Sequence, residues 1–199
     1  MKTLLLTLTT ILSALPLATM AADSESKFIA SDAPHDSRDV DTRALIREVG
    51  ARIHKRFVWD PRIPQTVNLG TLDRQDVTYG QLLALLRIYS CAVIQDDSIV
   101  EVIPDAFASR VGQPLLSADN LKTLDDEWVT VIVPVKGMSA VQLITILRPL
   151  VPTTGQINAS SERNAMIISD RSANVRRIIE LTKGLENLPP VSTEVRREQ

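Results

Sequence analysis

The sequence predicts an α+β protein built from two small α/β modules, with the element order β-α-β-β-α-β-β followed by β-α-β-β-α. Short runs rich in Val and Ile alternate with segments whose apolar residues recur at helical spacing. Hydrophobic residues make up 44% of the chain but aromatic residues only 4%, so its cores are mainly aliphatic. Residues 105–127 show no sustained period. The sequence therefore predicts a first module at 23–104, a linker at 105–127, a second module at 128–187 and a flexible tail at 188–199.

The first 22 residues have the pattern of a signal peptide. Lys2 gives a positive start, residues 4–17 form an apolar run, and small residues follow it. The run is shorter than the roughly 20 residues that a membrane-spanning helix needs. We therefore expect cleavage after Ala21 or Ala22 and export of the chain, with an uncleaved amphipathic anchor as the alternative.

Composition argues against several classes of function. The formal net charge of −2 gives no electrostatic basis for binding nucleic acid. Cys91 is the only cysteine, which excludes an internal disulfide, and its apolar surroundings in the sequence indicate a buried structural thiol rather than a reactive one. The two histidines lack ligand spacing, and the acidic run 125–127 is interpreted as solvated, with weak Ca²⁺ binding as the alternative. We predict no enzymatic activity, no metal and no cofactor.

The first module opens with a short predicted edge strand at residues 27–30. A helix then begins at an N-cap, either Asp39 or Asp41, and runs to about His54. Gly50 lies inside this helix, where glycine costs about 1 kcal/mol relative to alanine, so it indicates close packing. The next elements are strands at 57–60 and 66–69.

A capping box begins the second helix of the first module. Thr78 and Gln81 are spaced so that the hydroxyl and the side-chain amide can each satisfy a free backbone amide. Leucines between residues 82 and 86 supply the buried face of this helix. Strands at 92–94 and 99–103 follow, joined through a polar tip as a β-hairpin.

The second module begins with a strand at 128–135 that is almost entirely β-branched or aromatic. Ser139 and Gln142 form another predicted capping box, and the helix that it opens ends before Pro149. The remaining elements are a pair of strands and a final helix, at 156–159, 165–169 and 172–185.

In this arrangement the chain resembles the N-terminal periplasmic domains of a bacterial secretin, most closely that of the type II secretion system. The first module is similar to the family's first N-domain, a fold shared with the signalling domain of some TonB-dependent receptors. The second is similar to the second, NolW-like N-domain, a KH-like ring-building fold. The resemblance is carried in the first module by residues 44–49, 57–63, 92–94 and 100–103, and in the second by 133–135, 147–151 and 164–174.

The resemblance implies a non-enzymatic periplasmic component or accessory of a type II protein secretion system that mediates protein–protein assembly. The implied partners are secretin subunits, the inner-membrane clamp protein of the system and further copies of the chain, with association to the outer membrane through a secretin complex. A periplasmic signalling or regulatory module is the alternative. The resemblance does not include the family's barrel domain, so a split or truncated secretin, an accessory ring and a competitor all stay open.

Two kinds of contact site are predicted. An exposed strand edge offers unpaired amide and carbonyl groups to which a partner strand can add. We expect such an edge at Phe28, Ile29 and Ala30, near Asp96 and Asp97 of the hairpin tip, with an ordinary solvated strand as the alternative. The resemblance also implies ring packing through ion pairs between copies of the second module. The residues expected there are Arg171, Arg176, Arg177, Glu162 and Glu180.

Overall fold

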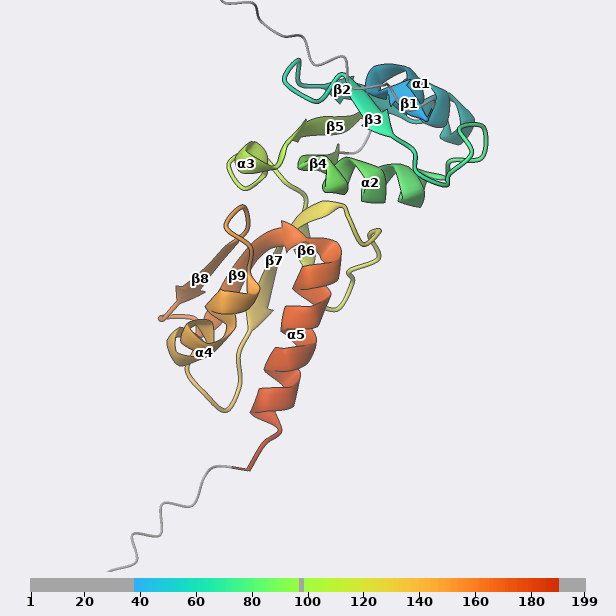
Figure 1. The fold of residues 1–199 in the computed structure, drawn as a ribbon. Helices are drawn as coiled ribbons and strands as arrows, with labels where there is room; N and C mark the ends of the chain where they lie inside the picture. Colours follow the sequence, from blue (N-terminus) through green and yellow to red (C-terminus); the bar gives the residue numbers. More distant parts are fainter. Residues whose placement is uncertain (1–37, 97–98, 190–199) are drawn as a thin grey trace, which may run out of the picture. The chain divides into compact units, whose positions relative to one another are not determined.

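The computed structural model describes residues 38–96 and 99–189, which lie within one compact unit spanning 35–199. The predicted signal peptide and the predicted strand at 27–30 fall outside the described residues. Within the described part of the chain, no helix has both the length and the apolar content needed to cross a membrane. The fold is α+β with two small modules, which confirms the predicted class (Figure 1).

Helix α1 (Thr42–Ile53) begins and ends by local signals that the sequence contains. The Asp41 carboxylate accepts a hydrogen bond from the amide of Ala44, as an N-cap does. His54 ends the helix in the left-handed conformation, with φ of 56°. The predicted helix is therefore confirmed, with Asp41 as the cap.

The first module contains two small sheets. Strand β1 (Asp39–Asp41) pairs antiparallel with β3 (Thr66–Asn68). Strand β2 (Arg56–Trp59) pairs parallel with β5 (Ile99–Pro104), which pairs antiparallel with β4 (Cys91–Asp96) in the predicted hairpin. The sequence did not predict β1, because three residues next to a helix cap show no alternation of their own.

Helix α2 (Tyr79–Ile88) confirms the first capping box. The amide of Gln81 donates to the Thr78 hydroxyl, and the side chain of Gln81 accepts from the amide of Thr78. The helix buries its leucines against the core of the first module. Members of that core include Leu45, Ile46, Val49, Leu82, Leu83, Leu86, Val93, Val100 and Val102.

Gly50 lets α1 approach the strand that follows it. A Cβ atom at this position would lie 2.8 Å from Cδ2 of Phe57 and 3.0 Å from the carbonyl oxygen of Lys55. We expect Gly50→Ala to lower the free energy of unfolding by about 1 kcal/mol, because overpacking outweighs the gain in helix propensity. The matched control is Gly184→Ala, at a helix position with nothing within 4 Å, which we expect to be stabilising. Urea denaturation of both variants tests this contrast, and two changes of the same sign would contradict it.

The second module has a four-stranded sheet in the order β6-β7-β9-β8. Strand β7 (Trp128–Pro134) lies antiparallel to β9 (Ala165–Arg171), and β8 (Gln156–Ser160) also pairs antiparallel with β9. Helices α4 (Ala140–Leu147) and α5 (Ser172–Glu186) pack on one face of this sheet (Figure 1). The core between them includes Val129, Val131, Val133, Leu143, Leu147, Met166, Ile168, Val175 and Ile178.

Regular structure within residues 105–127 departs from the expectation of a structureless linker. This segment contains helix α3 (Asp105–Ala108) and strand β6 (Leu115–Ser117), and β6 pairs parallel with β7. Each element has only three or four residues, too few to show a period, and β6 depends on a partner strand for its hydrogen bonds. Where the two domains begin and end stays a prediction.

The start of α4 shows that the second predicted capping box is wrong. Ser139 occupies the N-cap position but its side chain makes no capping hydrogen bond. Instead the side-chain oxygen of Asn164 accepts from the amide of Ala140 at 2.8 Å. A residue distant in sequence therefore takes the role that local spacing assigned to Ser139. A short 3₁₀ turn, Arg148–Leu150, follows α4 where proline was expected to end it.

Candidate functional site

Most of the predicted partner-binding edge lies outside the described residues. This applies to Phe28, Ile29, Ala30 and Asp97. Asp96 is the exposed last residue of β4 and pairs in register with Ile99. A docking role for this edge stays a prediction.

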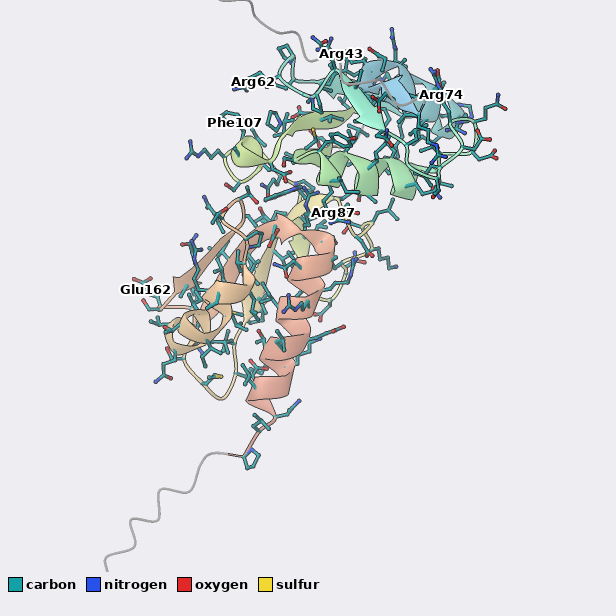
Figure 2. All side chains as sticks on the ribbon, in the orientation of Figure 1. Arg43, Arg62, Arg74, Arg87, Phe107 and Glu162 are labelled. Carbon is teal, nitrogen blue, oxygen red and sulfur yellow. The ribbon has the colours of Figure 1, made fainter. Side chains whose placement is uncertain are left out.

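The structure places the predicted ring-packing residues on two elements. Arg177 and Glu180 are exposed on α5, and Glu162 is exposed in the turn between β8 and β9 (Figure 2). Arg171 and Arg176 contact acidic residues of their own chain. Pairing with a neighbouring copy stays a prediction for all five.

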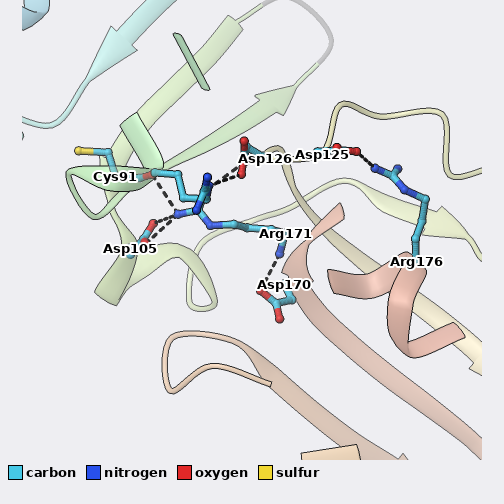
Figure 3. A network of polar contacts seen from close by, with 8 residues as sticks. Cys91, Asp105, Asp125, Asp126, Asp170, Arg171 and Arg176 are labelled. Carbon is cyan, nitrogen blue, oxygen red and sulfur yellow. Dashed lines mark hydrogen bonds and ion pairs between the residues drawn. The ribbon is translucent and has the colours of Figure 1, made fainter. Parts of the chain in front are cut away.

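Arg171 lies at the centre of a polar network between the two modules (Figure 3). Its Nη2 atom donates to both carboxylate oxygens of Asp105, at 2.7 and 2.8 Å, and to the carbonyl oxygen of Cys91 at 3.2 Å. Its Nη1 atom donates to the carbonyl oxygen of Asp126 at 3.3 Å. The guanidinium carbon also lies 5.7 Å from the ring centre of Trp128. One side chain therefore contacts β4, α3, β7 and the loop before β7.

Further polar contacts join the first module to the end of residues 105–127. Arg87, in the last turn of α2, pairs with Asp126 at 2.8 Å. The Tyr79 hydroxyl donates to the carboxylate of buried Glu127 at 3.1 Å. Burial, with help from the nearby Glu127, raises the pKa of Tyr79, so this hydroxyl keeps its proton and remains a donor.

An apolar cluster lies beside the polar network. Trp128 is only 1% exposed and packs with Ala92 and Ile94 of β4 and with Ala108 of α3. These residues come from three elements on both sides of the connection between the modules. The contact between the modules therefore contains a buried apolar cluster as well as charged pairs.

The acidic run 125–127 is not simply solvated. Asp125 pairs with Arg176, Asp126 with Arg87, and Glu127 accepts from Tyr79. The sequence contained a signal for the pair of Asp125 with Arg176 alone: residues 105–127 carry more acidic than basic side chains, whereas the second module carries more basic than acidic ones. Within the described residues no cluster of His, Cys, Asp and Glu could hold a metal ion.

The Cys91 side chain is buried, as its apolar surroundings predicted. Burial, with a smaller contribution from Asp105, raises the pKa of the thiol to about 11. We expect alkylation by iodoacetamide at pH 8.5 to be about 100-fold slower in the folded than in the urea-unfolded protein, because two pKa units reduce the thiolate a hundredfold. The unfolded chain ionises its thiol first, so this group's contribution to stability is lost as the pH rises through 9 to 11. Mass spectrometry of a labelling time course measures the two rates, and equal rates would contradict the prediction.

Apolar side chains on two elements of the second module's sheet and on α4 are exposed. On the sheet face without helices, Ile132 of β7 lies opposite Ile167 of β9, and they are 46% and 39% exposed. On α4, Val141 and Ile146 are about half exposed, and because they are five positions apart they lie on different sides of the helix. Exposed apolar patches of this kind mark contact surfaces between proteins more often than scattered single residues do. Sequence periodicity did not identify these outward-facing residues.

Comparison with known proteins finds similarity to bacterial secretins. Residues 130–190 match the family model described as the bacterial type II/III secretion system short domain. Secretin XcpQ of Pseudomonas aeruginosa is 28% identical over 151 residues, covering 75% of this chain and 22% of XcpQ. Secretin GspD of Vibrio cholerae is 27% identical over 163 residues, covering 79% of this chain and 24% of GspD. The chain thus spans about a quarter of the length of these relatives.

A solved structure shows the same fold. The chain matches the type II secretion system outer membrane complex of Klebsiella pneumoniae, which contains PulD, PulS and the PulC HR domain, with a TM-score of 0.62 and 22% identity. The match covers 75% of this chain and 26% of the matched one. These matches to secretins agree with the prediction that the chain is not an enzyme. By sequence and by fold, the chain is therefore related to the N-terminal domains of the type II secretins.

Proposed function

We propose that the chain is a periplasmic assembly component of a type II protein secretion system, which joins secretin subunits through its second module. The observation that carries this proposal is the sequence match to secretins over three quarters of the chain. Uncovered apolar residues on the sheet and on α4 of the second module support it.

The exposed apolar side chains suit a side-by-side arrangement of copies. Val141 and Ile146 lie on α4, whereas Ile132 and Ile167 lie on the sheet face that carries no helix. A contact between different surfaces of successive copies generates a ring when the rotation closes. Arg177, Glu162 and Glu180 then form ion pairs at the rim of the contact, each worth only about 0–1 kcal/mol.

The first module docks the inner-membrane clamp protein in this proposal. Support comes from the relationship to secretins, and the solved Klebsiella complex contains the HR domain of PulC together with PulD. The predicted edge at Phe28, Ile29 and Ala30 is the candidate surface, by addition of a partner strand. A signalling function through the first module is the competing proposal, and it gives the second module no role.

A pull-down from solubilised cell envelope tests the proposed function. Tagged chain is expected to recover secretin subunits or the clamp protein, identified by mass spectrometry. Recovery of neither partner at micromolar concentrations of the chain rules the proposal out. Recovery of a regulator alone favours the signalling function.

A matched pair of variants tests the surface. Ile132→Asp places a charge on the uncovered sheet face, and we expect it to abolish recovery of secretin subunits. Ile88→Asp alters an isoleucine that is 69% exposed at the end of α2, and we expect it to leave recovery unchanged. Circular dichroism of both variants establishes that they are folded. Equal recovery by the two variants would exclude the sheet face as the contact.

A further inference from the structure

We infer that the two modules form one rigid unit, in which Arg171 is the positioning residue that fixes the second module against the first. This inference concerns the isolated chain and does not depend on the proposed function. It follows from three properties of residues 105–127, which we call the connecting segment.

The connecting segment is held at both ends and in its middle. Asp105 at its start is bonded to Arg171, and β6 in its middle is a strand of the second module's sheet. At its end, Asp125 pairs with Arg176 and Asp126 with Arg87 (Figure 3). A segment fixed at these points has little free length in which a hinge could form.

The pair between Arg171 and Asp105 is well shielded from water. The side chains of Arg171 and Asp105 are 13% and 16% exposed, whereas the Asp125 side chain of the neighbouring pair is 79% exposed. Both oxygens of Asp105 accept from the same guanidinium nitrogen. Shielded charge pairs with several hydrogen bonds hold a defined geometry, while exposed pairs contribute little.

Backbone contacts add to the side-chain contacts between the modules. Val93 of β4 forms a parallel bridge with Glu127, next to the start of β7. The carbonyl oxygen of Glu127 in turn accepts from the amide of Ser172, the first residue of α5. Arg171 is both the last residue of β9 and the N-cap residue of α5, so its own backbone is fixed by two elements. The guanidinium therefore extends to the first module from a rigid base.

Residual dipolar couplings of the full chain, uniformly labelled with ¹⁵N, test the inference. Couplings from the first and the second module are expected to fit one common alignment tensor. In Arg171→Ala we expect the common fit to be lost, with each module following its own tensor. The couplings within each module also show whether that module is still folded, so reorientation and unfolding are distinguished by the same data.

Two further variants complete the design. Asp105→Ala removes the other partner of the pair and is expected to behave like Arg171→Ala. Arg177→Ala removes an exposed arginine from the same helix region and is expected to keep the common tensor. Two separate tensors in the unchanged protein would overturn the inference of one rigid unit. A common tensor in both Arg171→Ala and Asp105→Ala would overturn the role assigned to Arg171.

Discussion

Replacing Trp128 by alanine is expected to lower the free energy of unfolding by about 4 kcal/mol, because a fully buried aromatic side chain is lost and a cavity is left behind. Trp128 is 1% exposed and packs against Ala92, Ile94 and Ala108. Ala92 and Ala108 are too small to fill the space, and Ile94 belongs to a strand whose position is fixed by its sheet. The surrounding structure can therefore close little of the cavity. Urea denaturation monitored by circular dichroism measures the loss.

Trp128→Phe is the control that separates volume from polarity. Among the described residues, the indole Nε1 atom of Trp128 has no hydrogen-bond partner, so its removal costs no hydrogen bond. We expect this variant to lower the free energy of unfolding by about 1 to 2 kcal/mol, which is a much smaller loss than that of the alanine variant. If phenylalanine proved as destabilising as alanine, packing alone would not account for the role of the tryptophan.

Replacing Asn164 by alanine is expected to cost about 3 kcal/mol of stability. The side-chain oxygen of Asn164 accepts from the amide of Ala140, and its side-chain nitrogen donates to the carbonyl oxygens of Val135 and Met138 at 2.9 and 3.0 Å. Its backbone also has a φ of 46°, a conformation that asparagine tolerates better than alanine. One residue therefore supports the start of α4, the end of β7 and the turn between β8 and β9.

Three controls resolve these contributions at Asn164. Asn164→Gly keeps the backbone conformation and loses all side-chain bonds, so its cost relative to Asn164→Ala isolates the backbone strain. Asn164→Asp keeps the acceptor for Ala140 and loses the two donated bonds. Ser139→Ala is expected to change stability by no more than about 0.5 kcal/mol, because Ser139 makes no capping bond. A larger effect at Ser139 than at Asn164 would contradict the observed cap.

Local signals in the sequence predicted most of the fold. Asp41 and Thr78 cap their helices through residues only three positions away. Spacing identified Thr78, and it left Asp39 and Asp41 as the two candidates for the first cap. Strand β7 was predictable for the same reason, because its β-branched residues are consecutive. Where the residues that stabilise an element lie within a few positions of each other, the sequence is sufficient to predict that element.

Features that depend on distant partners were not predicted. Asn164 caps a helix 24 positions away, and Arg171 bonds to Asp105 at a separation of 66. The sequence marked Arg171 as a contact residue, but nothing in its spacing indicates Asp105 or Trp128. Strand β6 has three residues and exists through its pairing with β7, so no period reveals it. The contacts of Arg171 belong to the network between the modules, and their long sequence separations explain why sequence reasoning missed that network.

The parallel pairing of β2 with β5 has a consequence for the order in which the chain folds. A newly made chain emerges with its N-terminus first. Strand β2 has no partner until residues 99–104 have been made, because it pairs with β5. Strands β1 and β3 can pair earlier. During that interval Phe57 and Trp59 lack the strand beside which they pack, and loop closure over this distance slows the final step. The first module should therefore be most prone to misfolding and aggregation before the β4–β5 hairpin forms, and the hairpin is the element that completes it.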